Sequence, residues 1–281
     1  MTQTGATAND DRDDYQRLAQ DSVIVSEKLC ASLAIPAGAR VLDIACGTGH
    51  TAIAAARRRA IVTGVDINER SLARARLRAQ AEGLNIEFMN ADGTATPFPD
   101  ASFDYALSTV GLVFFRDKQR AAQELARVVK AEGVIALTAY THESIPGLIY
   151  DLVNSLYKNP TVPAGPYYTW SSGPLAGELL GPYFHHIRMR LDTFDICFPS
   201  SADMFEHLAT WNPPIRMAVE MSAPEVRKAL REGCIGIIDQ FNRAIDGTLM
   251  ANIDYTIITA VRSEQSAMGR SSTLAPAQSR G

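Results

Sequence analysis

The sequence predicts an α/β fold in which helices cover both faces of a mostly parallel sheet. Apolar segments of strand length alternate with segments of helical periodicity along the first half of the chain. One of these apolar segments runs directly into a glycine turn that precedes a helix. Because parallel strands need crossover connections, this alternation indicates βαβ units with both faces of the sheet buried.

The first strand is expected at residues 40–45 and leads into Gly47-Thr48-Gly49. Glycines two residues apart let a ligand approach the backbone closely, and the next helix points free N–H groups at the turn. Asp66 follows the second strand, where an acidic residue of nucleotide-binding units accepts hydrogen bonds from ribose hydroxyls. The sequence therefore predicts a nucleotide site at this turn.

The remaining elements of the first half continue the alternation. After the first strand, further strands are expected at residues 61–65, 86–90, 103–109 and 133–140, with helices at residues 50–59, 69–82 and 117–130. Open α/β sheets bind ligands outside the carboxyl ends of their strands, so the site should form at that edge.

The pattern changes after Tyr140 and predicts added segments. Helices are expected around the apolar positions Leu148, Ile149, Leu152, Val153 and Leu156, at residues 173–180 and within residues 201–246. Strands are expected at residues 185–197 and 251–262, and a Pro-rich turn region at residues 159–166. Within residues 201–246, Ser222-Ala223-Pro224-Glu225 predicts a capping box. The apolar stripe expected after it is Val226, Leu230, Cys234, Ile237, Ile238, Phe241 and Ile245.

The glycine turn is compatible with two classes of cofactor. Gly47 to Ala52 fits the G-x-G-x-x-A pattern of dinucleotide sites, so a nicotinamide or flavin cofactor is one alternative. Asp43 favours the other, because a carboxylate beside the turn would repel a pyrophosphate but suits the ammonium and sulfonium charges of S-adenosylmethionine.

Further motifs follow the glycine turn in a defined order. The set is Val41 to His50, Val62 to Asp66, Asn90 to Gly93, Phe98 to Asp104 and Val128 to Val134. Over about residues 38–140 the chain resembles the class I S-adenosylmethionine-dependent methyltransferases, and especially the small-molecule enzymes of ubiquinone and menaquinone biosynthesis. Ala45 departs from the usual first glycine, and Ala131-Glu132-Gly133 departs from the usual Pro-Gly-Gly.

The resemblance implies a Rossmann-like, seven-stranded, mostly parallel sheet with helices on both faces and a helical cap from the N-terminus and insertions. It implies S-adenosylmethionine as cofactor, bound by Asp43, Ala45, Gly47, Gly49, Asp66, Ile67, Asp92, Gly93, Ser108 and Thr109. In this assignment Asp43 serves the methionine end, Asp66 the ribose and Asp92 the adenine amino group.

The expected reaction is methyl transfer by in-line displacement to a small, largely apolar organic acceptor, such as a natural-product intermediate. Two alternatives keep the fold and the cofactor: a non-methyl reaction such as a cyclisation, and a non-catalytic cofactor-binding protein. Holding nucleophile, carbon and sulfur in line contributes to catalysis without a base. If a base acts, His142 is best placed, although a solvated loop histidine is the alternative.

The acceptor pocket is expected among large, mostly apolar side chains of the cap and the fourth strand's end. The residues proposed are Tyr15, Val110, Phe114, Trp170, Met204 and Trp211. Each of them has core packing as its alternative role.

Composition excludes several function classes. The formal charge of −4, with no long basic stripe, argues against nucleic acid as a partner. The 4 cysteines form no C-x-x-C pair and the histidines lack ligand spacing, so no metal site is expected. Neither a signal peptide nor a membrane span is predicted, which points to the cytoplasm. A homodimer is left open.

The expected organisation is one methyltransferase domain at residues 14–263 between mobile ends at residues 1–13 and 264–281. Its core would comprise about residues 38–140, 173–200 and 250–262, and its cap about residues 14–35, 145–172 and 201–246.

Overall fold

The computed structural model describes residues 23–157 and 167–264. Its centre is a seven-stranded sheet with the strand order β3-β2-β1-β4-β5-β7-β6, so the Rossmann-like fold expected from the sequence is confirmed. The strands are β1 (Arg40–Ile44), β2 (Ile61–Asp66), β3 (Ile86–Asn90), β4 (Phe103–Thr109), β5 (Val129–Tyr140), β6 (Phe184–Phe198) and β7 (Leu249–Arg262).

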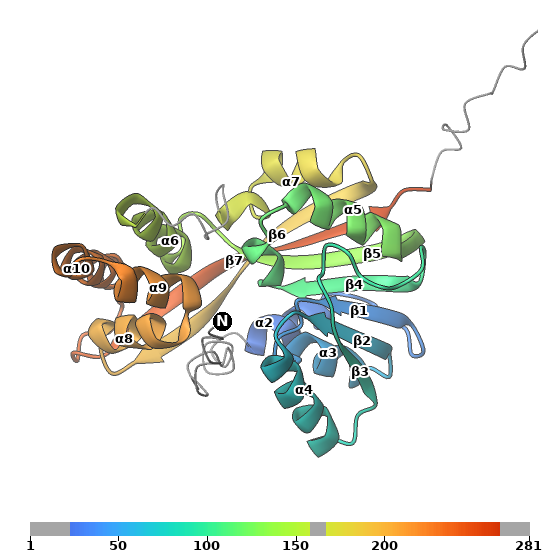
Figure 1. Cartoon of the computed structure of the whole chain (residues 1–281), viewed down its shortest axis with the longest axis horizontal. Helices are drawn as coiled ribbons and strands as arrows, with labels where there is room; N and C mark the ends of the chain where they lie inside the picture. The colour runs from blue at the N-terminus through green and yellow to red at the C-terminus, as the bar shows by residue number, and fades with distance from the viewer. Residues whose placement is uncertain (1–22, 158–166, 265–281) are drawn as a thin grey trace, which may run out of the picture.

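Strands β1 to β5 are parallel, and β7 is antiparallel to both β5 and β6. Helices α2 (Val23–Ala31), α3 (His50–Ala56) and α4 (Glu69–Ala81) lie on one face of the sheet, and α5 (Lys118–Val128) and α7 (Gly173–Leu180) lie on the other (Figure 1). Both faces are therefore covered, as buried parallel strands require.

Helix α3 packs closely on the sheet because its side chains are small. Residues 51–56 are all buried, and four of them are alanines. Strand β1 is buried from Val41 to Ile44. This close contact fixes the turn between β1 and α3 against the carboxyl ends of the strands.

The last two strands extend beyond the rest of the sheet. Tyr140, the last residue of β5, pairs with Tyr255, whereas the β6–β7 ladder continues from Thr193 opposite Asp254 to Phe198 opposite Leu249. We call these extended segments, residues 193–198 and 249–254, the arm. Figure 1 shows the arm leading away from the sheet to a group of helices.

These helices form a cap at the carboxyl ends of the strands. Helices α8 (Ser201–Trp211), α9 (Pro213–Met221) and α10 (Pro224–Phe241) connect β6 to β7, and α10 packs on both α8 and α6 (Ile145–Leu156). Two short 3₁₀ helices, η2 (Gly111–Phe114) and η3 (Tyr167–Thr169), contact each other. No helix in the described ranges is long and apolar enough to cross a membrane.

Two local predictions for the insertion are wrong. Helix α10 begins after Ala223 with no side-chain cap, because Ser222 instead ends α9 and accepts a hydrogen bond from Arg227 through its carbonyl. The apolar stripe stops at Phe241, where α10 ends, and Ile245 is fully exposed in the following turn.

The predicted start of β5 is also corrected. The helix was expected to reach residue 130 and the strand to begin at residue 133, but α5 ends at Val128 and β5 begins at Val129. A register irregularity lies between the pairs Phe103–Val129 and Tyr105–Val134, so the extra residues bulge out of the ladder. The predicted mobile ends, apart from residue 264, and the Pro-rich segment predicted at residues 159–166 lie outside the described residues.

Candidate functional site

The turn between β1 and α3 is built from residues with left-handed backbone. Ala45, Gly47 and Gly49 have φ angles of 55°, 52° and 82°. A Cβ at Gly49 would lie 3.0 Å from the Ala75 Cβ, so the helix packing there requires glycine. At Gly47 a Cβ would meet no atom of the described residues within 4 Å, because this residue lines a cavity.

Asp66 connects this turn to the end of β2. Its Oδ2 accepts a hydrogen bond from the Gly47 N–H and its Oδ1 from the Asn68 N–H, both at 2.8 Å. Burial raises the pKa of Asp66, and the backbone hydrogen bonds from Asn68, Gly47 and Ile67 oppose that rise. A carboxylate oxygen has more than one acceptor position, so each oxygen can still accept from a ligand hydroxyl.

Asp43 lies beneath the turn and is 1% exposed. Its Oδ2 accepts from the Ala52 N–H at 2.9 Å, whereas its Oδ1 makes no hydrogen bond within the described residues. Burial raises the pKa of Asp43 well above its ordinary value. A nearby cation would favour the ionised form of this carboxyl.

His50 begins α3 and lies against the Arg78 guanidinium. The Arg78 Nη2 is 2.9 Å from the His50 Nδ1, and the Arg78 Nη1 donates to the Thr48 carbonyl at 2.7 Å. Burial and the arginine charge lower the pKa of His50 to about 4. His50 is therefore a neutral side chain at physiological pH. Arg78 fixes the turn through its hydrogen bond to the Thr48 carbonyl.

A cavity of about 430 Å³ opens above the turn. Its turn side is formed by polar residues and backbone, namely Ala45, Cys46, Gly47, Thr48, His50, Asp66, Ile67, Asn68 and Ser71. Its cap side is mostly apolar and is formed by Phe114, Tyr140, Ile145, Ile149, Tyr150, Met204, Leu208, Asn212 and Ile215, among others. One cavity thus joins a polar surface to an apolar one.

Three hydroxyl groups of the cavity lining contact one another. Thr51 Oγ1 is 2.7 Å from Thr109 Oγ1 and donates to Ser26 Oγ at 3.1 Å. These residues come from α3, the end of β4 and α2, and all three line the cavity. The chain of hydroxyls gives the middle of the cavity both donors and acceptors.

The structure brings about half of the predicted site residues to the cavity. Those that line it are Ala45, Gly47, Asp66, Ile67, Thr109, Val110, Phe114 and Met204. Those that are described but do not line it are Asp43, Gly49, Asp92, Gly93, Ser108, His142, Trp170 and Trp211. Trp170 is buried and donates to the Leu112 carbonyl, which is a packing role. Tyr15 lies outside the described residues.

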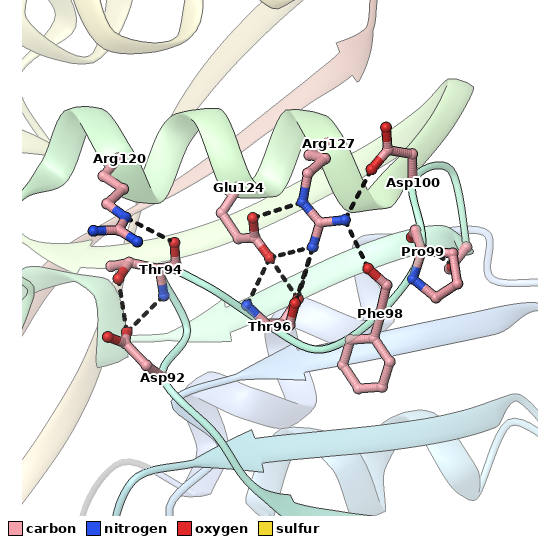
Figure 2. Close-up of polar contacts among 10 residues, drawn as sticks. Asp92, Thr94, Thr96, Phe98, Pro99, Asp100, Arg120, Glu124 and Arg127 are labelled. Atoms are coloured by element: carbon pink, nitrogen blue, oxygen red, sulfur yellow. Dashed lines mark hydrogen bonds and ion pairs between the residues drawn. The ribbon is translucent and has the colours of Figure 1, made fainter.

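Asp92 lies on the loop between β3 and β4, which is linked to helix α5. Its Oδ1 accepts from both the backbone N–H and the hydroxyl of Thr94, a local turn that lowers the pKa of Asp92 (Figure 2). Arg120 donates to the Thr94 carbonyl, which links this turn to α5 (Figure 2). The predicted contact of Asp92 with the adenine stays a prediction.

Arg127 anchors the next part of the same loop. It donates to Glu124, Asp100 and the Phe98 carbonyl, and Glu124 in turn accepts from the Thr96 N–H at 2.8 Å (Figure 2). Burial alone would raise the pKa of Glu124, but the hydrogen bonds from Arg127 and Thr96 bring it below its ordinary value. The loop between β3 and β4 is thereby fixed beside the site.

His142 lies away from the cavity lining. Its Nδ1 is 3.1 Å from the Asp151 Oδ2, and its ring packs against Tyr168 with the centroids 4.3 Å apart. Its side chain is 41% exposed. A role as base stays a prediction. In the described ranges, no group of three His, Cys, Asp or Glu side chains could hold a metal ion.

Sequence reasoning missed several polar residues of the cavity. Ser26, Tyr140, Tyr150 and Asn212 line it but belong to no motif, and Thr51 occupies a variable position of the glycine motif. The available signal for Tyr150 was its place on the buried face of α6, together with Ile145 and Ile149. Asn212 precedes two prolines, which signals a helix N-cap and nothing more.

Comparison with known proteins identifies the central part of the chain. Residues 41–133 match the family model described as a methyltransferase domain. An uncharacterized protein of Mycobacterium tuberculosis is 37% identical over 180 residues, which are 63% of this chain and 65% of that protein. The chain therefore spans slightly less than two thirds of this relative.

Two relatives with described activities match over a shorter range. Demethylmenaquinone methyltransferase of Thermus thermophilus is 39% identical over 103 residues, covering 36% of this chain and 47% of the relative. The 27-O-demethylrifamycin SV methyltransferase of Amycolatopsis mediterranei is 34% identical over 128 residues, covering 44% and 47%. Both alignments cover about half of each relative.

Solved structures confirm the fold. The YcgJ protein of Bacillus subtilis superposes with a TM-score of 0.59 at 22% identity, over 86% of this chain and 99% of that one. The (4+2)-cyclase SpnF superposes with a TM-score of 0.53 at 21% identity, over 92% and 86%. At these identities the likeness shows the fold alone.

Proposed function

We propose that this protein, whose residues 41–133 match a methyltransferase-domain family, transfers the methyl group of S-adenosylmethionine to a small, largely apolar organic acceptor. The observation that carries the proposal is the single cavity that joins the Gly47–Asp66 turn to an apolar wall from the cap. A transferase needs two ligands in one enclosure, with the reacting atoms in line.

The turn side fits the cofactor by its chemistry. The carboxylate of Asp66 is oriented by two backbone N–H groups and can accept hydrogen bonds from the ribose diol. Gly47 leaves room for close approach to the backbone, and Ile67 offers an exposed apolar side chain for the adenine. Asp43 supplies a buried carboxyl beneath the turn for the cationic end.

Other predicted contacts remain part of this proposal. Thr109 lines the cavity at the end of β4, beside the buried Ser108, where the methionine end would lie. Asp92 and Gly93 would approach the adenine from the loop between β3 and β4. Gly93 has no room for a Cβ, which would lie 2.6 Å from the Ile44 Cγ2. Gly49 supports the turn through its packing on α4.

S-adenosylmethionine supplies a methyl carbon bound to a sulfonium leaving group. The chain's task is to hold the acceptor in line with that carbon and to exclude water, which the cap helices do through Phe114, Ile149 and Met204. The similarity to the rifamycin and menaquinone methyltransferases supports a small organic acceptor.

Calorimetry with S-adenosylhomocysteine, in the absence of metal, tests the cofactor assignment. Asp66→Asn removes the charge that accepts from the ribose, and such hydrogen bonds are worth about 1.5–3 kcal/mol, so the affinity should fall roughly 10- to 150-fold. Asp239→Asn, the same change on the exposed surface of α10, is the matched control and should bind normally. Equal affinities for the two variants would contradict the assignment.

Two further measurements separate the alternatives. Binding of NADH at the same site would favour a nicotinamide cofactor. Release of S-adenosylhomocysteine on incubation with S-adenosylmethionine and phenolic or quinol acceptors would establish methyl transfer. A product formed without that release would establish a non-methyl reaction such as a cyclisation.

A further inference from the structure

One hydrogen-bonded pair stands out on the cap side of the cavity. Asn212 Nδ2 donates to the Tyr150 hydroxyl oxygen at 2.8 Å, across a sequence separation of 62 residues. Each residue is 4% exposed, and each lines the cavity. Tyr150 comes from α6 and Asn212 from the junction of α8 and α9, so the pair joins two separate parts of the cap.

Both partners are held in fixed orientations. The Tyr150 ring packs edge-on against Phe114, with the centroids 6.4 Å apart and the planes at 87°. Asn212 Oδ1 accepts from the Ile215 N–H at 3.3 Å and so caps α9. Phe114 thus positions the Tyr150 ring and Asn212 its hydroxyl oxygen, which makes the hydroxyl a preorganised contact whose ordering costs a ligand little.

The surroundings of the pair are apolar. Ile145, Ile149, Met204, Leu208 and Ile215 contribute the neighbouring lining. A wholly hydrocarbon ligand in this space would lie against the Tyr150 hydroxyl without adding a hydrogen bond. The hydroxyl oxygen has more than one acceptor position, so an oxygenated ligand can add a hydrogen bond to the one from Asn212, and the pair therefore favours such ligands.

We propose that the acceptor of this enzyme carries a hydroxyl or carbonyl oxygen on an otherwise apolar ring system, and that this oxygen hydrogen-bonds to the Tyr150–Asn212 pair. The proposal rests on the methyltransferase function proposed above and assigns to the pair the selection of oxygenated acceptors. Tyr150 is the specificity-determining residue that contacts the acceptor, and Asn212 is a positioning residue that orients its hydroxyl.

The experiment compares two probes that differ by one hydroxyl group, 2-naphthol and naphthalene. Their dissociation constants are measured by fluorescence or calorimetry with the full-length protein, first alone and then saturated with S-adenosylhomocysteine. In the wild type, 2-naphthol should bind about tenfold more tightly than naphthalene, as expected for one additional hydrogen bond. Tyr150→Phe should abolish this preference and leave the affinity for naphthalene within about twofold.

Two other variants complete the test. Asn212→Ser keeps a good N-cap for α9 but removes the amide donor, so it should reduce the preference for 2-naphthol only in part. Tyr105→Phe is the matched control, because its hydroxyl donates to the Ala34 carbonyl and the residue does not line the cavity. It should retain the wild-type preference.

The outcomes are distinguishable. A wild-type preference for 2-naphthol that Tyr150→Phe removes, with normal thermal unfolding, supports the inference. An unchanged preference in Tyr150→Phe overturns it, as does a wild type that binds neither probe or binds both equally. Binding of S-adenosylhomocysteine, measured separately in the same titrations, decides the proposed function independently of the probes.

Discussion

Substitution of Gly47 by alanine tests whether the turn is built around a ligand. Gly47 has a φ of 52°, and a Cβ there would meet no atom of the described residues within 4 Å. The left-handed backbone makes alanine less favourable by about 1 kcal/mol, and this is the only cost in the unliganded protein. For a domain of this size that corresponds to a fall in Tm of about 2–4 °C.

The effect on binding should be larger, because the new methyl group projects into the cavity. Overpacking a close contact by one methyl group costs about 1–3 kcal/mol, which weakens binding roughly 5- to 150-fold. Gly38→Ala is the matched control: its φ is 83°, it too has open space, and it does not line the cavity. The two variants should lose similar stability in calorimetric unfolding, and only Gly47→Ala should lose affinity for S-adenosylhomocysteine. Equal affinities would refute the placement of the cofactor on this turn.

Three further predictions concern the groups around the cavity. Burial raises the pKa of Asp43, so the folded state keeps a proton that the unfolded state releases. The stability that this group contributes is therefore lost as pH rises above about 4. Asp43→Asn should gain Tm relative to the wild type from about pH 4 to about pH 8, and parallel plots of Tm against pH for the two proteins would contradict this. Glu124→Gln should lower the free energy of unfolding, measured in urea, by about 1–3 kcal/mol, because it removes the buried charge that pairs with the one-third-exposed Arg127. Asp100→Asn, on the exposed side of the same arginine, should lower it by less than about 0.5 kcal/mol. His142→Ala should lower turnover less than tenfold because its imidazole lies outside the cavity lining. A fall of about 10²–10⁴ with unchanged affinity for S-adenosylhomocysteine would instead support His142 as the base.

The turn side of the cavity could be predicted because its signals are local. The apolar run of β1, the glycine turn and Asp66 lie within 27 residues, and βαβ geometry brings them together without reference to the rest of the chain. The order of strands and helices followed from the same periodicities. The start of β5 could not be predicted, because the register irregularity between β4 and β5 leaves no local pattern in the sequence.

The cap could not be predicted to the same degree, because its contacts join distant segments. Ser222 had the spacing of a capping box, yet it ends α9, and the competition between two adjacent helices is decided by their tertiary packing. Trp170 was expected in the acceptor pocket but packs in the core, where its indole N–H finds the Leu112 carbonyl. Tyr150 and Asn212 meet only because α6 and the α8–α9 junction fold over the same opening.

The position of the insertion explains how one cavity acquires two independent halves. Because β6 and β7 extend past the end of β5, residues 199–248 emerge beyond the carboxyl edge of the sheet, next to the turn that the first two strands form. The arm fixes the cap through a continuous antiparallel ladder, while the turn is fixed by β1, β2 and α3. Substitutions in α6, α8 or α9 can therefore alter the apolar wall of the cavity without disturbing Gly47 or Asp66. Under the proposed function, a fold of this kind can keep the turn and change the ligand that the cap selects, so the identity of the acceptor has to be sought in the cap and not in the motifs.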